Sequence, residues 1–144
     1  MTSWRQQQRD RNFRRQALDR SRAVLDKQFS PLQKAAKKMA EARMTAQRTA
    51  PYFAHGLDKL RFAPKPGLGT LGVTARGLCY YDPDFITAPD SWTVEQLAGV
   101  IVHELLHVIS NHSDRGIKCG VQLDEQSLWN IAADAEINYK LRSQ

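Results

Sequence analysis

Two histidines and a glutamate lie within the five residues His103 to His107, at a spacing that could support metal-assisted chemistry. On an α-helix, residues four apart leave the same face about one turn apart, so both imidazoles could bind one ion. Glu104 lies beside that face. In this H-E-x-x-H pattern, zinc lowers the pKa of a coordinated water to about 7, and the carboxylate takes the proton of that water. The pattern predicts a zinc-dependent hydrolase with His103 and His107 as ligands and Glu104 as catalytic base.

The residues around the motif are apolar and predict a buried helix. The run 97–102 leads into it, and apolar residues also lie between and after the two histidines: Leu105, Leu106, Val108 and Ile109. A helix that is apolar nearly all round is buried. Buried imidazoles and carboxylates carry a desolvation penalty, and a divalent cation satisfies all three groups together. The alternative is a pair of core histidines satisfied by other means.

The expected helix has a start and a stop in the sequence. Thr93 and Gln96 fit a capping box, and Asn111 can adopt the left-handed conformation that ends a helix. We expect a helix from about Val94 to Ser110. The polar stretch 112–120 that follows has turn character, and we expect it to be an exposed loop.

A catalytic zinc normally has three protein ligands, and the third must come from elsewhere in the chain. His112 is the nearer candidate. If the helix continued to it, however, its side chain would point away from His103, so only a sharp turn at Asn111 could bring it to the ion. Asp134 is the alternative, in the middle of a second helical pattern over residues 129–138.

That second helical pattern carries two stripes. Asn130, Asp134 and Asn138 recur every four residues beside an apolar stripe of Trp129, Ala133, Ile137 and Leu141. Antiparallel packing of the two helices would bring Asp134 over the histidines, and Asn130 and Glu136 are weaker candidates. If Asp134 is not a ligand, we expect it to accept a ring N–H of one histidine. Most polar stripes are solvated helix faces, which is the alternative here.

The segments V-H-E-L-L-H-V-I-S-N-H and W-N-I-A-A-D-A-E-I-N resemble a metallopeptidase family that is often found with a von Willebrand factor A-like domain. Residues 50–53 and 77–83 also fit its layout, and the resemblance covers about Ser30 to Leu141. It implies a zincin-like fold with His103 and His107 as zinc ligands, Glu104 as general base and Asp134 as third ligand. Some membrane-linked zinc proteases share the histidine spacing but use a glutamate as third ligand. Asn130 stands at that place here, so the third ligand stays open between Asp134, His112 and Asn130.

Length and composition predict one modest globular domain, because 144 residues with 42% hydrophobic content can bury a core. No apolar stretch approaches the roughly 20 residues of a membrane span or forms a secretory leader. Cys79 and Cys119 lack C-x-x-C spacing, and we expect free thiols in a reducing compartment, although a minor role as zinc ligands stays open. These features predict a cytoplasmic protein.

The positive charge is concentrated near the N-terminus. Residues 1–50 hold 13 basic and 4 acidic residues, while the remainder hold 8 and 11. We expect residues 1–29 to form a basic helical extension and residues 30–144 to form the metallopeptidase-like domain. The extension is interpreted either as a contact to nucleic acid or an acidic partner, or as a solvated helix. The solvated helix is favoured, because Trp4 and Phe13 alone are too few for base stacking.

The remaining pattern predicts an α+β fold. Ser30, Pro31 and Gln33 begin a helix that runs to about Arg48, followed by a short helix over 52–60, a strand over 61–63 and a hairpin of 71–74 with 78–81. His55 is expected to be structural. We expect strand 78–81 to lie beside the cleft, where a substrate peptide adds to its edge. Tyr80 or Tyr81 could stabilise an oxyanion, although packing in the core is favoured.

The sequence therefore predicts a metallopeptidase that acts on a peptide or protein substrate. A partner domain or chain that covers the cleft is a further expectation. Two alternatives remain. One is a catalytically inactive zinc-binding module that engages a partner through the basic extension. The other is a nucleic-acid-associated protein with structural zinc, whose binding would weaken steeply with salt.

Overall fold

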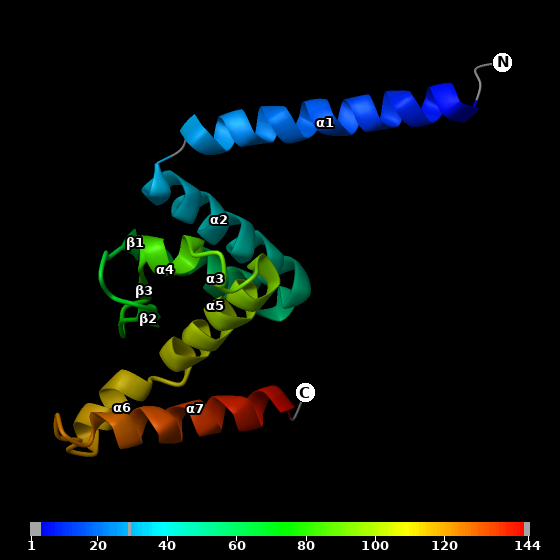
Figure 1. Ribbon diagram of the computed structural model, residues 1–144. Coiled ribbons are helices and arrows are strands. Elements are labelled where there is room, and N and C mark those ends of the chain that lie inside the picture. The colour runs from blue at the N-terminus through cyan, green and yellow to red at the C-terminus, as the bar shows by residue number, and fades with distance from the viewer. Residues whose placement is uncertain (1–3, 29, 143–144) are drawn as a thin grey trace.

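The computed structural model of the chain describes residues 4–28 and 30–142 and shows helices around a small sheet (Figure 1). The described elements are, in order, α1 (Trp4–Gln28), α2 (Pro31–Thr49), the 3₁₀ helix η1 (Pro51–Phe53), α3 (Ala54–Lys59), β1 (Arg61–Pro64), β2 (Leu71–Val73), β3 (Leu78–Tyr81), α4 (Pro83–Thr87), α5 (Val94–Ile109), α6 (His112–Lys118) and α7 (Gln126–Arg142). The predicted α+β class is confirmed at this level.

The two capping boxes predicted from sequence are both present. Ser30 caps α2 with Gln33, and Thr93 caps α5 with Gln96; each side chain accepts from the backbone of the other residue in its box. A capping box satisfies two backbone donors that a helix start leaves open. Both starts are therefore fixed by local sequence, and the start of α5 sets the position of the H-E-x-x-H motif along the helix.

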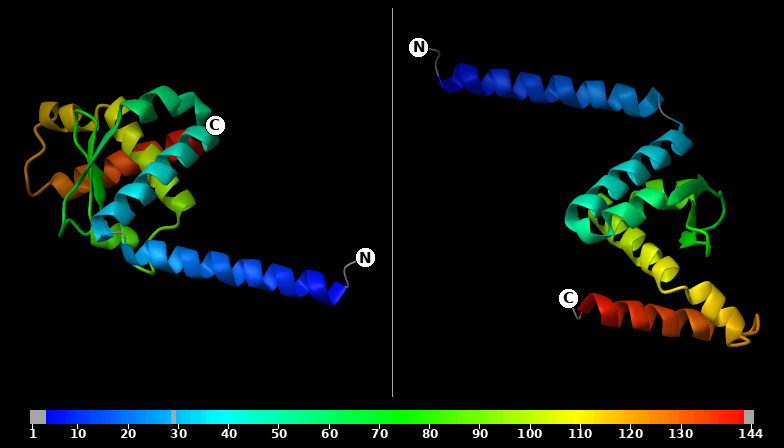
Figure 2. Two further views of the ribbon diagram at one scale, coloured as in Figure 1. Left: turned by 90° about the horizontal axis from the view of Figure 1, so that it is seen from above. Right: turned by 180° about the vertical axis from the view of Figure 1, so that it is seen from behind.

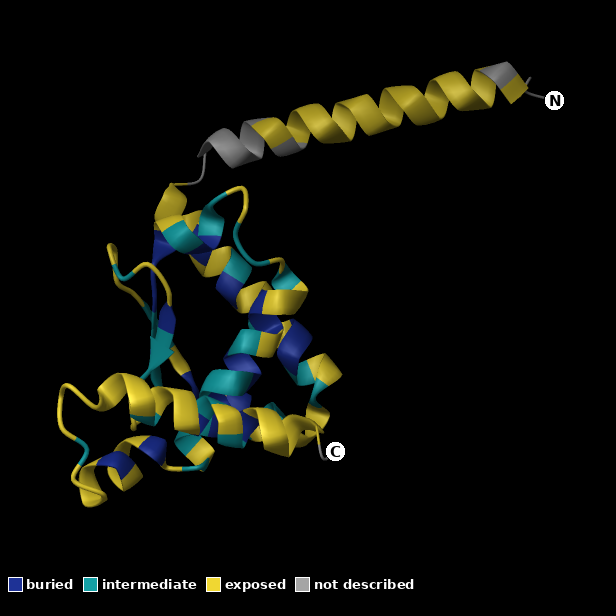
Figure 3. Ribbon diagram, turned by 60° about the horizontal axis from the view of Figure 1, so that its bottom comes forward, coloured by how far each residue is buried: buried dark blue, intermediate teal, exposed yellow. Residues whose placement is uncertain are grey.

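The core lies mainly between α2 and α5, on which the buried residues are concentrated (Figure 3). The buried face of α2 is rich in alanine, which allows α5 to approach closely, while α5 contributes larger side chains. The buried residues of these two helices are Ala35, Met39, Ala42, Thr45 and Ala46 on α2, and Leu97, Ala98, Ile101, Val102, Leu105 and Leu106 on α5.

The sheet has the strand order β1-β3-β2, with β1 parallel and β2 antiparallel to β3. The predicted hairpin of β2 and β3 is confirmed. The expectation that strand 78–81 lies at the edge beside the cleft is wrong, because β3 is paired on both sides. Strand β2 contacts α5 and, among the described residues, pairs with β3 alone. The parallel partner β1 is distant in sequence, and hairpin signals carry no information about it.

The stretch 112–120 is not the exposed loop that its polar residues predict. Asn111 has φ 54°, in the left-handed region, and the chain turns there into α6, on which His112 and Gly116 are buried. The predicted end of α5 at this asparagine is therefore confirmed, but the turn begins another helix. A short helix was hard to predict here because its burial depends on contact with α7.

The chain then runs back across α5 as α7 (Figures 1 and 2). The predicted apolar stripe of α7 is confirmed at Ala133 and Ile137, which are buried, whereas Leu141 is 42% exposed and Trp129 is half-buried. Most of α7 is exposed in Figure 3. α7 is therefore held to the domain by a narrow contact centred on its middle.

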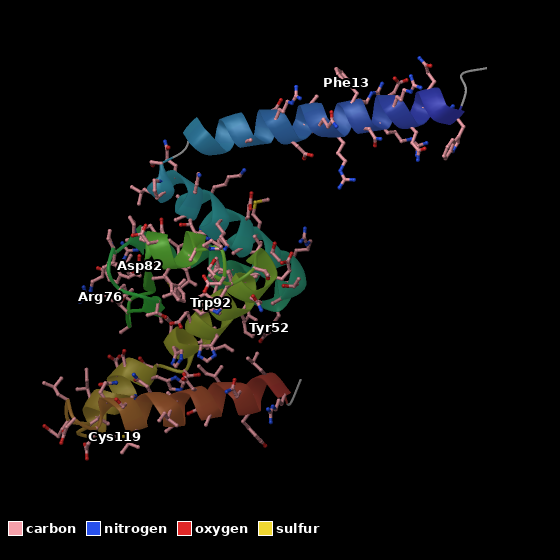
Figure 4. All side chains as sticks on the ribbon, in the orientation of Figure 1. Phe13, Tyr52, Arg76, Asp82, Trp92 and Cys119 are labelled. Carbon is pink, nitrogen blue, oxygen red and sulfur yellow. The ribbon has the colours of Figure 1, made fainter. Side chains whose placement is uncertain are left out.

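Helix α1 extends away from the other elements, and its described side chains are exposed (Figures 2 and 4). Phe13 is 73% exposed and projects from the side of α1 that faces away from the domain in Figure 4. Among the described residues, no helix combines the length and the apolar character that a membrane span requires.

Candidate metal centre

Three predicted ligand residues converge between α5 and α7. His103 Nε2 lies 3.0 Å from His107 Nε2 and 3.2 Å from Asp134 Oδ1, and His107 Nε2 lies 3.0 Å from the same carboxylate oxygen. Side chains with nitrogen and oxygen atoms fill this region in Figure 4. Each residue offers one donor atom to a common point, and the group could hold a metal ion.

A proton fits this triangle poorly, because three acceptor-capable atoms face one another. If both rings carried a hydrogen on Nε2, the two hydrogens would point at each other across 3.0 Å. If only one did, a lone pair of the other ring would face the Asp134 carboxylate at close range. A cation bound by all three atoms removes both conflicts. The donor set therefore fits a metal ion better than it fits a hydrogen-bond network.

The protonation state of His107 is also suited to metal binding. Burial and the neighbouring His103 ring hold the pKa of His107 below its usual value, and they outweigh Asp134, which acts in the opposite direction. Although the distance from His107 to Asp134 resembles that of an ion pair, the lowered pKa indicates a neutral ring at pH 7. A neutral imidazole has the lone pair that a metal requires.

Glu104 lies next to the ligands and has an unusual carboxyl group. Burial raises the pKa of Glu104 to about 7; a hydrogen bond from the Val73 backbone N–H opposes this rise, and Asp134 adds to it. A carboxyl group with a pKa near the working pH can both accept and donate a proton. The edge strand β2 therefore contributes directly to the site through its backbone.

One pocket of about 500 Å³ joins these groups, which is a usual size for a ligand site. Its polar end contains the three candidate ligands and Glu104. The other walls come from β2, α6 and α7, with apolar side chains such as Val108, Ile117, Val121 and Trp129. The side chain of Asp134 is 50% exposed, so the ligand group is accessible from solvent.

His112, the alternative third ligand, lies behind His107. The turn at Asn111 does occur, but it places His112 Nδ1 2.9 Å from His107 Nδ1, the ring nitrogen that faces away from Asp134. His112 is therefore outside the group of three donor atoms, and its side chain is only 5% exposed. Its Nε2 lies 3.4 Å from Glu136 Oε2, in a geometry that falls short of a hydrogen bond.

The two weaker candidates are engaged elsewhere. Glu136 accepts hydrogen bonds from Lys140 Nζ at 2.6 Å and from Arg115 Nη1 at 2.9 Å, and these lower the pKa of Glu136 to about 2. Asn130 lines the pocket, and its Oδ1 accepts from Gln126 Nε2. The geometry thus favours Asp134 over both as the third donor.

Trp129 holds α6 against α7. Its Nε1 donates to the His112 carbonyl at 3.2 Å, and its indole lies so close to Gly116 that an added Cβ would be 3.0 Å from Nε1. Only glycine fits at Gly116 without movement of a neighbour. Sequence analysis assigned Trp129 to an apolar stripe, and nothing in the pattern indicated its hydrogen bond across 17 residues.

The other residues considered from sequence lie elsewhere. Tyr81 is 4% exposed and packs in the core, as favoured, and burial raises its pKa. Lys65 lies over the ring of Tyr80. His55 is exposed, and both cysteines are free thiols. Burial, followed by Glu104, raises the pKa of Cys79 to about 12, which disfavours the thiolate that binds metals.

Comparison with known proteins gives one match. No curated protein and no solved structure matches the chain. A family model described as "Putative metallopeptidase domain" matches residues 33–144, which include every element from α3 to α7 and most of α2. The association with a von Willebrand factor A-like domain stays a prediction. The matched range contains the His103, His107 and Asp134 group and leaves α1 outside, and because it spans most of the sequence, the chain belongs to this metallopeptidase domain family.

Proposed function

We propose that the chain is a zinc-dependent metallopeptidase of zincin-like fold, in which His103, His107 and Asp134 hold the ion and Glu104 is the catalytic base. The observation that carries the proposal is the convergence of three donor atoms beside a partly buried carboxyl group in one open pocket. The family supports peptide bonds as the substrate class.

Zinc is the proposed ion because two of the three donors are imidazole nitrogens. Magnesium and calcium prefer oxygen ligands, whereas imidazole suits zinc. With bonds of about 2.0 to 2.2 Å, the ligand atoms of a tetrahedral zinc site lie about 3.3 to 3.5 Å apart. The three distances of 3.0 to 3.2 Å are within a few tenths of an ångström of that spacing.

The protein residues supply binding and proton transfer. Bound zinc would polarise the scissile carbonyl and lower the pKa of a coordinated water to about 7. Glu104 takes the proton of the attacking water and gives it to the leaving amine, and its partly buried carboxyl group lies next to the ligands, where both transfers would occur. The neutral His107 leaves its lone pair available for the ion.

The substrate peptide would lie along β2. Thr74 N–H donates to Leu78 O of β3, and Thr70 O accepts from the N–H of Asp82, just after β3. By strand alternation, the backbone groups of Val73 lie on the opposite side of β2, where Val73 lines the pocket and its N–H contacts Glu104. An extended peptide can add to such an edge by backbone hydrogen bonds. The apolar wall around Trp129 then offers space for an apolar side chain of the substrate.

The test is cleavage of a complex peptide mixture by the zinc-loaded chain, read by mass spectrometry. Glu104→Gln should bind zinc as tightly as the wild type but cleave at least about 10²-fold more slowly, because it removes only the proton acceptor. Glu95→Gln is the matched control, since Glu95 is an exposed acid in the first turn of the same helix.

Equal cleavage by Glu104→Gln and wild type would contradict the assigned base. A zinc-loaded wild type that cleaves none of the peptides would favour the non-catalytic zinc module instead.

A further inference from the structure

His107 has two ring nitrogens with different partners. Nε2 faces the candidate metal site, and Nδ1, on the opposite side of the ring, faces His112. His107 Nδ1 lies 2.9 Å from His112 Nδ1. A neutral imidazole has one N–H and one lone pair, so one of these two atoms donates and the other accepts. The direction matters, because His107 can offer a lone pair to a metal through Nε2 only if its hydrogen is on Nδ1.

The position of Glu136 determines which of the two Nδ1 atoms donates this hydrogen bond. The buried His112 Nε2 lies 3.4 Å from Glu136 Oε2. A carboxylate can only accept, and a nitrogen lone pair facing it would be repelled, so the hydrogen of His112 belongs on Nε2. His112 Nδ1 is then the acceptor, His107 Nδ1–H is the donor, and the lone pair of His107 Nε2 points to Asp134 and His103.

The contacts from Glu136 through His112 to His107, called the relay below, are held in place by neighbours of His112 and of Glu136. The His112 backbone carbonyl accepts from Trp129 Nε1, and the left-handed turn at Asn111 sets where α6 begins. Glu136 is anchored by Arg115 and Lys140. The His112 ring is 5% exposed, so water has little access to compete for its nitrogens. The surroundings of His107 are thus built by residues of α5, α6 and α7.

We infer that His112 is a positioning residue which, with Glu136, fixes His107 in the tautomer that binds the metal. The inference rests on the metal site of the proposed function and assigns His112 a role outside the ligand set. Outer partners of ligating histidines typically contribute 10- to 100-fold to metal affinity. This role also explains the position of α6, because His112 is its first residue and the helix places that ring beside His107 Nδ1.

The first experiment measures zinc affinity by competition with a chromophoric chelator. His112→Phe keeps a ring but has no acceptor, and it should weaken zinc binding by about 10- to 100-fold. His112→Asn places Oδ1 where Nδ1 lies, still accepts from His107, and should recover most of the affinity. His55→Phe is the matched control at an exposed histidine and should leave affinity unchanged.

The second experiment needs no variant. Long-range ¹H–¹⁵N correlation NMR of the wild-type chain, with and without zinc, assigns the hydrogen on each imidazole. We expect the hydrogen of His112 on Nε2 and that of His107 on Nδ1. Circular dichroism of each variant establishes that it is folded, and the wild-type spectra decide the matter if His112→Phe does not fold.

The outcomes separate the two proposals. If the wild type binds zinc and His112→Phe binds it equally tightly, or if His112 carries its hydrogen on Nδ1, the relay is overturned and the proposed function stands. If the wild type binds no zinc, the metallopeptidase proposal fails and the relay fails with it.

Discussion

At the scale of single residues, Glu104 has a partly buried carboxyl group with a strongly raised pKa. Its pKa of about 7 lies above its ordinary value of 4.5, chiefly because of burial. Between these two pH values the unfolded chain loses this proton while the folded chain keeps it. The metal-free protein should therefore become less stable as pH rises from 4.5 to 7, by up to about 3 kcal/mol, and then level off.

Urea unfolding of the metal-free chain across this pH range measures the effect. The histidines of the site also titrate there, so the quantity to compare is the difference between wild type and Glu104→Gln, which share those histidines. The variant should gain stability relative to wild type as pH rises. A difference that stays constant from pH 4.5 to 7 would contradict the raised pKa.

Most residues of the candidate centre could be predicted from sequence, because their relative positions follow from local helix geometry. His103, Glu104 and His107 are related by helix periodicity, which holds wherever a helix forms. Asp134 followed from the expectation that the second helix folds back. The relay through His112 could not be predicted, because it depends on the direction of the chain after Asn111 and on an ion cluster around Glu136.

At the scale of elements, the contact of α6 with α7 depends on the absence of a side chain at Gly116. Gly116→Ala would push against the indole of Trp129, which is held by the His112 carbonyl. Overpacking of this kind costs about 1 to 3 kcal/mol, against a gain of roughly 1 kcal/mol from removing a helical glycine, and the fixed indole places Gly116 toward the costly end of that range. We expect lower stability and weaker zinc binding, because His112 moves with α6.

Gly99→Ala is the matched comparison on α5. A Cβ at Gly99 meets nothing within 4 Å, so this change should stabilise the chain by up to about 1 kcal/mol. Urea unfolding and zinc titration of both variants check the pair. If Gly116→Ala were as stable as Gly99→Ala, the clamp by Trp129 would be unimportant.

Elements with local signals were predicted and elements defined by distant contacts were not. Ser30 and Thr93 fixed the starts of α2 and α5 through capping boxes, and the turn ending in Gly77 fixed the hairpin. The pairing of β1 with β3 joins residues 17 apart and leaves no periodic signal, so β3 was misplaced at the edge. Helix α4 was missed, although Asp82 and Pro83 form a recognisable start.

At the scale of the whole molecule, α1 stands apart from the domain that carries the site. It makes no extensive contact with any described element, and the family match begins after it, at residue 33. The favoured interpretation of α1 as a solvated helix, and the alternative of a contact to nucleic acid or an acidic partner, both stay predictions. The division at residue 29 is likewise a prediction from charge.

Deleting residues 1–28 tests this separation. The deletion removes eight basic and three acidic residues but keeps Ser30, so the cap of α2 survives. We expect the urea midpoint and zinc affinity to be unchanged. If α1 contacts a polyanion, heparin binding by the full chain should fall steeply with salt and be lost in the deletion. A large loss of zinc affinity would instead show that α1 supports the site.

The most direct test of the central claim is the metal content of the purified chain beside three variants. We predict one zinc ion per wild-type chain, loss of that zinc in His103→Ala and Asp134→Ala, and retention in Asn130→Ala, which changes another pocket residue on α7. Full zinc occupancy in Asp134→Ala, or no zinc in the wild type at any concentration, would contradict the proposed ligand set.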